Sequence, residues 1–153
     1  MKRFTRICAL VLVSVLLIPI QVFATVERNS STEIVYMDDG SYYVIVIEES
    51  RTRATYSKTG SKHYTYYSSE NVAQWKVTLT GTYTYNGSTS SCTAASASAT
   101  IYKSTWSVAS KSATRSGSTA TGNFVIKLSL LLGQSTNVPV TLTLACDKNG
   151  NLT

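Results

Sequence analysis

The chain has 153 residues, enough for one domain with a substantial buried core. Fourteen Lys and Arg against eight Asp and Glu give a formal net charge of +6. No dense basic run is interleaved with aromatic residues, so the composition gives no support to nucleic-acid binding. One histidine and three cysteines leave few residues for metal or nucleophilic chemistry.

The N-terminus has the pattern of a secretory signal peptide. Three basic residues in the first six positions precede an apolar run at 7–20, and a small-residue cleavage site ends at Ala24. The run is shorter than the roughly 20 residues that a membrane-spanning helix needs, and no later segment approaches that length. We therefore predict a signal peptide at 1–24, a secreted or envelope-associated mature chain, and no transmembrane anchor in that mature chain.

The composition of the mature chain predicts an all-β protein. Ser and Thr make up about a third of residues 25–153, and all ten tyrosines lie between Tyr36 and Tyr102. Such β-branched, aromatic and short polar residues suit a half-buried sheet and form poor helices. We predict a flexible N-terminal segment at 25–32 and a single β-sandwich domain at 33–153.

Charge is distributed unevenly along the mature chain. Residues 25–49 carry six acidic residues and one basic residue, whereas residues 50–153 carry ten basic and two acidic residues. A basic body of this kind would be attracted to an anionic polymer or membrane surface. Scattered, solvated lysines are the alternative interpretation.

Turn signals divide the first half of the domain. Asp38-Asp39-Gly40 separates two apolar segments and predicts a hairpin, and Thr59-Gly60 predicts another. Residues 68–73 are the only place where a short helical turn fits. The predicted strands of this half are 33–36, 42–48, 51–57 and 62–67.

The second half shows the clearest alternation. From Trp75 to Tyr85, apolar and aromatic residues at odd positions alternate with threonines and a lysine, which indicates a strand with one buried face. Asn86-Gly87 then predicts a tight turn. A long strand is expected to carry one inner face from Ala120 to Leu132, with a loop at 133–137. The predicted strands of this half are 75–85, 90–102, 105–114, the long strand after Ser116-Gly117, and 138–146.

About nine short strands with regular turn signals predict an antiparallel β-sandwich of eight to ten strands. An immunoglobulin-like topology is one form of such a sandwich. In that fold, however, the core tryptophan lies between the two cysteines, whereas Trp75 precedes both cysteines of the mature chain.

Cys92 and Cys146 are the cysteines that remain after processing. An even count in an exported chain favours one intramolecular disulfide, with two free thiols or an intermolecular bridge as alternatives. Alternation along the last strand points Cys146 into the core. By closing a long loop, such a bond would stabilise the folded chain by roughly 4 kcal/mol on the chain-entropy model.

No constellation of catalytic or metal-binding residues emerges. His63 is the only base for a nucleophile and is expected at the surface. The adjacent carboxylate pairs Asp38/Asp39 and Glu48/Glu49 are interpreted as a turn and a strand end, not as the acid and base of a glycosidase. Asp147-Lys148-Asn149-Gly150-Asn151 begins like a calcium loop, but no bidentate Glu follows, so a turn is expected. We predict no catalytic, cofactor or metal residues and no enzymatic activity.

The tyrosine-rich region is the one feature with binding potential. Tyr64, Tyr66 and Tyr67 could present rings for stacking on sugars or for protein contact, so they are the candidate ligand-binding residues. Alternation places Tyr67 with His63 on the face opposite Tyr64 and Tyr66. The alternative is that tyrosine is common here only because it favours strands.

Four stretches also carry a resemblance to known proteins. They are Gly60–Tyr67, Trp75–Gly87, Cys92 and Val140–Gly150. In the spacing of their tyrosines, tryptophan and cysteines, the chain resembles a group of small exported, β-rich proteins of Gram-positive bacteria (Firmicutes) with no known activity. The resemblance implies export and a Cys92–Cys146 pair, and it carries over no catalytic residue.

These observations predict an exported, non-enzymatic binding or interaction module. Its expected partners are a cell-wall glycan, an anionic polymer or a surface protein, with no nucleic acid and no cofactor. The alternative is a secreted antibacterial or toxin-like effector, because small size, export and positive charge suit that class equally well.

Overall fold

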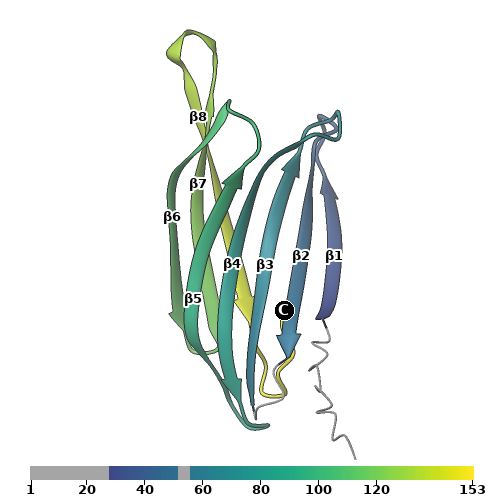
Figure 1. The fold of residues 1–153 in the computed structure, drawn as a ribbon, viewed down its shortest axis with the longest axis vertical. Coiled ribbons are helices and arrows are strands. Elements are labelled where there is room, and N and C mark those ends of the chain that lie inside the picture. The colour runs from purple at the N-terminus through teal and green to yellow at the C-terminus, as the bar shows by residue number, and fades with distance from the viewer. Residues whose placement is uncertain (1–27, 52–55) are drawn as a thin grey trace, which may run out of the picture.

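The computed structural model describes residues 28–51 and 56–153, and the predicted signal peptide lies outside them. The described residues form two antiparallel sheets packed face to face, as in a sandwich (Figure 1). The all-β prediction is therefore confirmed, and the eight described strands fall within the predicted number. The strands are β1 (Arg28–Tyr36), β2 (Tyr42–Arg51), β3 (Ser57–Tyr67), β4 (Ala73–Tyr85), β5 (Ser90–Ile101), β6 (Trp106–Ser116), β7 (Thr119–Ser129) and β8 (Ser135–Ala145).

Strand order follows the sequence in both sheets. One sheet has the order β1-β2-β3-β4-β5 and the other β6-β7-β8, so every hydrogen-bonded pair joins consecutive strands. The chain passes between the sheets once, through residues 102–105. An immunoglobulin domain instead distributes its strands between the sheets in Greek-key order. The sandwich here is built from two meanders.

The core lies between β3–β5 of the first sheet and the second sheet. The predicted inner face of β4 is confirmed, because Trp75, Val77 and Leu79 are fully buried. Their partners from the second sheet include Phe124 and Leu142. Alternating alanines on β5 keep that strand's inner face small, which lets the second sheet approach closely.

The hairpin turns at Asp38-Asp39-Gly40 and Asn86-Gly87 are confirmed, and both glycines adopt positive φ. The turn predicted at Thr59-Gly60 is wrong, because both residues lie inside β3. Gly60 serves a close approach: a Cβ there would overlap the Leu152 side chain. A glycine inside a strand often marks such a contact rather than a turn.

Several further elements differ from the sequence prediction. β8 begins at Ser135, inside the loop predicted at 133–137. In the segment 68–73, where a helical turn was expected, residues 68–72 form a turn with Asn71 at φ 60°, and Ala73 already begins β4. β1 begins at Arg28, inside the segment 25–32 that was expected to be flexible. The inner face expected to continue to Leu132 ends earlier, because β7 stops at Ser129.

The described part of the chain has one helical element, a 3₁₀ turn at Leu131–Gly133 (η1) at the tip of the β7–β8 hairpin. Within these described ranges no helix has the length and apolar character needed to cross a bilayer.

Candidate interaction surface

The three candidate tyrosines of β3 do not form one site. As alternation predicts, Tyr64 and Tyr66 lie on the inner face of the sheet and Tyr67 lies on the outer face. The centroid of the Tyr66 ring lies 5.5 Å from that of Trp75 and 5.7 Å from that of Trp106. The ring centroids of Tyr64 and Tyr43 are 6.0 Å apart. Tyr64 and Tyr66 therefore belong to the margin of the core. This agrees with the alternative interpretation, in which tyrosine is common here only because it favours strands.

Tyr43, Tyr64, Tyr66, Trp75 and Trp106 form an inner aromatic cluster, in which burial changes the acidity of one tyrosine hydroxyl. Burial raises the pKa of the Tyr43 hydroxyl, with a smaller contribution from neighbouring Tyr66. The Trp106 indole N–H donates to the Gln74 side-chain oxygen at 3.2 Å. The cluster fixes the sheet margin and leaves little of these rings free for a ligand.

Tyr67 belongs to a different arrangement, a row of three rings on the outer face of the first sheet. Tyr36, Tyr42 and Tyr67 are direct cross-strand partners on β1, β2 and β3. The ring centroids of Tyr42 and Tyr67 are 4.9 Å apart and nearly parallel, and those of Tyr36 and Tyr42 are 5.5 Å apart. We call these three residues the tyrosine row. Sequence reasoning missed Tyr36 and Tyr42, although their positions on either side of the Asp38–Gly40 turn already pair them in a hairpin.

The tyrosine row faces outward with apolar neighbours. The second sheet packs on the opposite face of the first sheet, and the Tyr36 side chain remains 71% exposed. Ile34 and Val44 form the next cross-strand pair on the same face, and Ile34 is also exposed. Aromatic and aliphatic side chains thus form one continuous strip over three strands, which is exposed on β1 and half-buried on β2 and β3.

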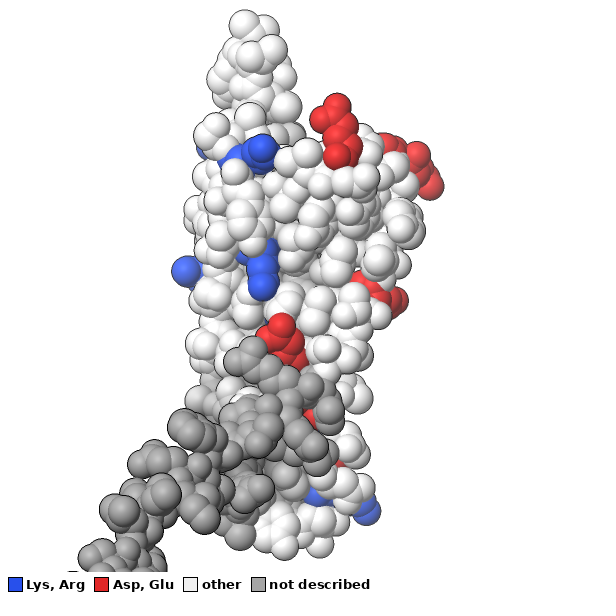
Figure 2. All heavy atoms as spheres, turned by 45° about the vertical axis from the view of Figure 1, so that its right-hand side comes forward, with Lys and Arg blue, Asp and Glu red and all other residues white. Residues whose placement is uncertain are grey.

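Carboxylates border the row at the end of the molecule where the β1–β2 and β3–β4 turns lie (Figure 2). Asp39 accepts hydrogen bonds from the Ser41 hydroxyl at 2.5 Å and from the Ser41 backbone N–H at 2.9 Å. These bonds lower the pKa of Asp39, so its negative charge persists well into the acidic range. The adjacent carboxylates Asp38 and Glu70 belong to the same two turns.

His63 is not at the surface, contrary to the sequence prediction. His63 is only 6% exposed, because its cross-strand partners Val46 and Thr78 flank it on the outer face of the sheet. Burial lowers the pKa of its imidazole, and Lys76 adds to this effect while Glu48 opposes it. Sequence alternation identified the face correctly but not the cover that neighbouring strands provide.

Cys92 and Cys146 are both buried in the core, and the structure contains them as free thiols. The predicted disulfide is therefore absent from it. Each thiol is turned to a nearby carbonyl: Cys92 donates to Ala94 O at 3.3 Å and Cys146 to Asp147 O at 3.5 Å. Burial raises the pKa of both thiols.

The two adjacent carboxylate pairs divide as predicted. Asp38 and Asp39 lie in a turn, while Glu48 and Glu49 point to opposite faces of β2. Glu49 lies on the inner face, where its Oε2 accepts from Lys58 at 2.9 Å.

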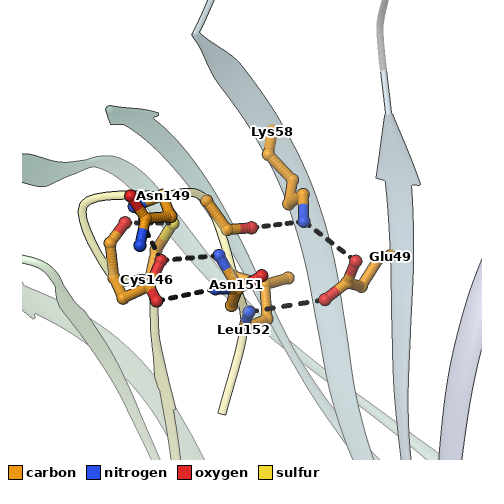
Figure 3. Close-up of polar contacts among 8 residues, drawn as sticks. Glu49, Lys58, Cys146, Asn149, Asn151 and Leu152 are labelled. Atoms are coloured by element: carbon orange, nitrogen blue, oxygen red, sulfur yellow. Dashed lines mark hydrogen bonds and ion pairs between the residues drawn. The ribbon is translucent and has the colours of Figure 1, made fainter. Parts of the chain in front are cut away.

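Glu49 also takes part in a C-terminal latch, formed by Glu49, Lys58, Gly150 and Leu152 (Figure 3). Lys58 donates to the Gly150 carbonyl, and the Leu152 backbone N–H donates to Glu49 Oε1 at 3.4 Å. The segment 147–151 forms the expected turn, in which the Asp147 carboxylate accepts from the backbone N–H groups of Asn149 and Asn151. These bonds lower the pKa of Asp147.

Hollows beside the latch are small. The hollow lined by Gly60 has a volume of about 160 Å³, and the hollow lined by Leu152 has a volume of about 190 Å³. Sites for drug-sized ligands usually have roughly 300–1,000 Å³. The tyrosine row is therefore a stronger candidate for recognition than these hollows, and it suits an extended ligand that lies across the sheet.

No protein-family model matches the chain, and comparisons with curated proteins and with solved structures find no significant match.

Proposed function

We propose that the processed chain is an exported, non-enzymatic interaction module of the cell envelope, and that the tyrosine row is its contact surface for a cell-wall glycan. The single observation that supports this proposal is the row itself. Three rings are held at consecutive cross-strand positions on a face that the second sheet does not cover. A sequence with a predicted signal peptide would bring this surface to the outside of the cell.

The geometry suits sugar rings for a physical reason. The stacked Tyr42 and Tyr67 rings cover one face of each other, so the tilted and exposed Tyr36 ring offers the free apolar face of the row. Together with the hydroxyl groups, this face matches the mixed apolar and polar faces of a pyranose. The backbone of three paired strands holds the rings in place, so little conformational entropy is lost on binding. The exposed Ile34 extends the apolar strip along the direction of β1.

Retention on isolated, lipid-free cell wall tests the proposal, with residues 25–153 measured at low and at high salt. We expect retention that survives high salt, because stacking is not screened as exposed charges are. In Tyr36→Ala/Tyr67→Ala we expect about a tenfold loss, as the removal of two stacked rings implies. Tyr56→Ala is the matched control, because Tyr56 is also exposed but lies at the opposite end of the sheet.

Each outcome is decisive once circular dichroism shows that the variants are folded. Equal retention of the double variant and the parent would contradict a role for the row. Retention that disappears in high salt would indicate charge-driven attachment instead. Failure of the parent chain to bind under either condition would reject the glycan proposal.

A further inference from the structure

The tip of the β7–β8 hairpin exposes three consecutive leucines. Leu130, Leu131 and Leu132 are 46%, 89% and 97% exposed, and we call them the leucine apex. In Figure 1 this hairpin projects beyond the other turns at its end of the molecule. Single exposed leucines are ordinary, but a contiguous apolar projection of this kind marks a site of interaction.

The backbone of the apex holds these side chains outward. Leu130 N–H donates to Gln134 O at 2.8 Å, which closes the loop above the Ser129–Ser135 pair. Leu132 then adopts φ 64°, a left-handed conformation that non-glycine residues seldom occupy. A glycine or asparagine would fit this position with less strain. The loop therefore combines backbone strain with an almost fully exposed leucine, which folding alone does not favour.

The root of the hairpin is fixed to the body of the domain. Ser129 N–H donates to Thr105 O at 2.8 Å, in the connection between β5 and β6. That connection also carries Tyr102, which is exposed, and Lys103. The apex is thus an apolar projection on a rigid support, with an amphipathic ring and a cation beside its base.

The strands that carry and support the apex, β4 to β8, contain charge of one sign. No Asp or Glu occurs between Asn71 and Cys146, whereas this stretch contains five basic residues. Lys127 lies near the end of β7, and Lys103 lies in the connection to which the hairpin root is bonded. Figure 2 shows positive groups just below the projecting apex and carboxylates on the other side of the same end.

We propose that the leucine apex inserts into the interfacial region of an anionic lipid bilayer, with Lys103 and Lys127 at the headgroup level. A convex apolar projection needs a deformable partner, and lipid accepts it without a complementary pocket. Leucines supply the apolar contact, while lysines and tyrosine are the residues favoured at the headgroup boundary.

The acidic turns set the orientation. Asp38 and Asp39 lie in the β1–β2 turn and Glu70 in the β3–β4 turn, at the same end as the apex but on the β1–β4 side (Figure 1), where an anionic surface would repel them. Docking must therefore tilt the molecule so that the β6–β8 side approaches the lipid and the β1–β2 side turns away. This inference is independent of the glycan proposal, because it uses a different face and a different partner.

Flotation with lipid vesicles tests the inference on residues 25–153, since the apolar run at 7–20 would itself bind lipid. The probes are vesicles of phosphatidylcholine alone and of phosphatidylcholine mixed with phosphatidylglycerol. We expect binding to the mixed vesicles at low salt. In Leu131→Ser/Leu132→Ser this binding should fall about tenfold or more. In Lys103→Gln/Lys127→Gln it should also fall, by about thirtyfold, as the removal of two near-surface charges implies.

Val35→Ser is the matched control, because Val35 is an exposed apolar residue on β1 and away from the apex. Its vesicle binding should equal that of the parent. A second readout reports insertion directly: Leu131→Trp should give fluorescence that brominated lipids quench beyond the parent background. Absence of binding to the mixed vesicles, equal binding of the serine double variant, or no additional quenching would each overturn the proposal.

Discussion

Lys58 and Glu49 form an ion pair whose Nζ–Oε2 distance is 2.9 Å, and the lysine side chain is almost completely buried. The pair joins β2 to β3 on the inner face, and Lys58 also donates to the Gly150 carbonyl. A buried cation is stable only when its partners remain in place. The C-terminal turn is therefore part of the folded core and not an appendage to it.

Removal of the Lys58 ammonium should strongly destabilise the domain. We expect Lys58→Met to lower the free energy of unfolding by about 3–5 kcal/mol, because it leaves Glu49 and the Gly150 carbonyl without their shared donor. Urea denaturation measures the loss. Lys111→Met is the control, since Lys111 is exposed and its loss should change stability by less than about 0.5 kcal/mol. Similar values for the two variants would contradict the latch.

The hydroxyl of Tyr83 connects the two sheets. It donates to the Leu144 carbonyl at 2.6 Å from a fully buried ring, and burial raises its pKa. Tyr83→Phe should lower the free energy of unfolding by about 1–3 kcal/mol, because a buried carbonyl loses its donor. Thermal denaturation of Tyr83→Phe beside Tyr56→Phe, where the ring is exposed, provides the measurement. No difference between these variants would contradict this role of the bond.

Mild acid should destabilise the domain through His63. Its folded-state pKa lies below the ordinary value of 6.5, so the unfolded chain binds the proton more readily. The resulting stability is complete above about pH 6.5 and is lost as the pH falls toward the folded-state pKa. In His63→Gln, the slope of melting temperature against pH should flatten in this window. The carboxylates Asp39 and Asp147 titrate at lower pH, where the parent and the variant should keep the same slope.

Thiol reactivity should report the burial of Cys92 and Cys146. Both thiols are buried with raised pKa values, so the native domain should alkylate slowly. In urea without reductant, intact-mass analysis of residues 25–153, which contain only these two cysteines, should show two added alkyl groups per chain. Addition of two groups only after reduction would instead establish the disulfide that the sequence favours.

The sequence by itself determined the elements whose signals are local. Side chains on a strand alternate between faces, so the pattern from Trp75 to Tyr85 identified both the strand and its buried side. Asp38-Asp39-Gly40 and Asn86-Gly87 identified their turns because glycine accepts positive φ without steric cost. These properties depend on a few neighbouring residues and on no distant contact.

Tertiary structure alone decided which faces are buried and which side chains gather on the exposed faces. The tyrosine row required the register of three strands, and the burial of His63 required cover from two neighbouring strands. Thr59-Gly60 has the composition of a turn, but both residues lie inside β3. The missing side chain of Gly60 leaves room there for Leu152, which is distant in the sequence. The alternation that predicted a buried Leu132 was cut short because β7 leaves the sheet pairing after Ser129. Periodicity fixes which side chains share a face, but burial depends on whether another part of the chain reaches that face.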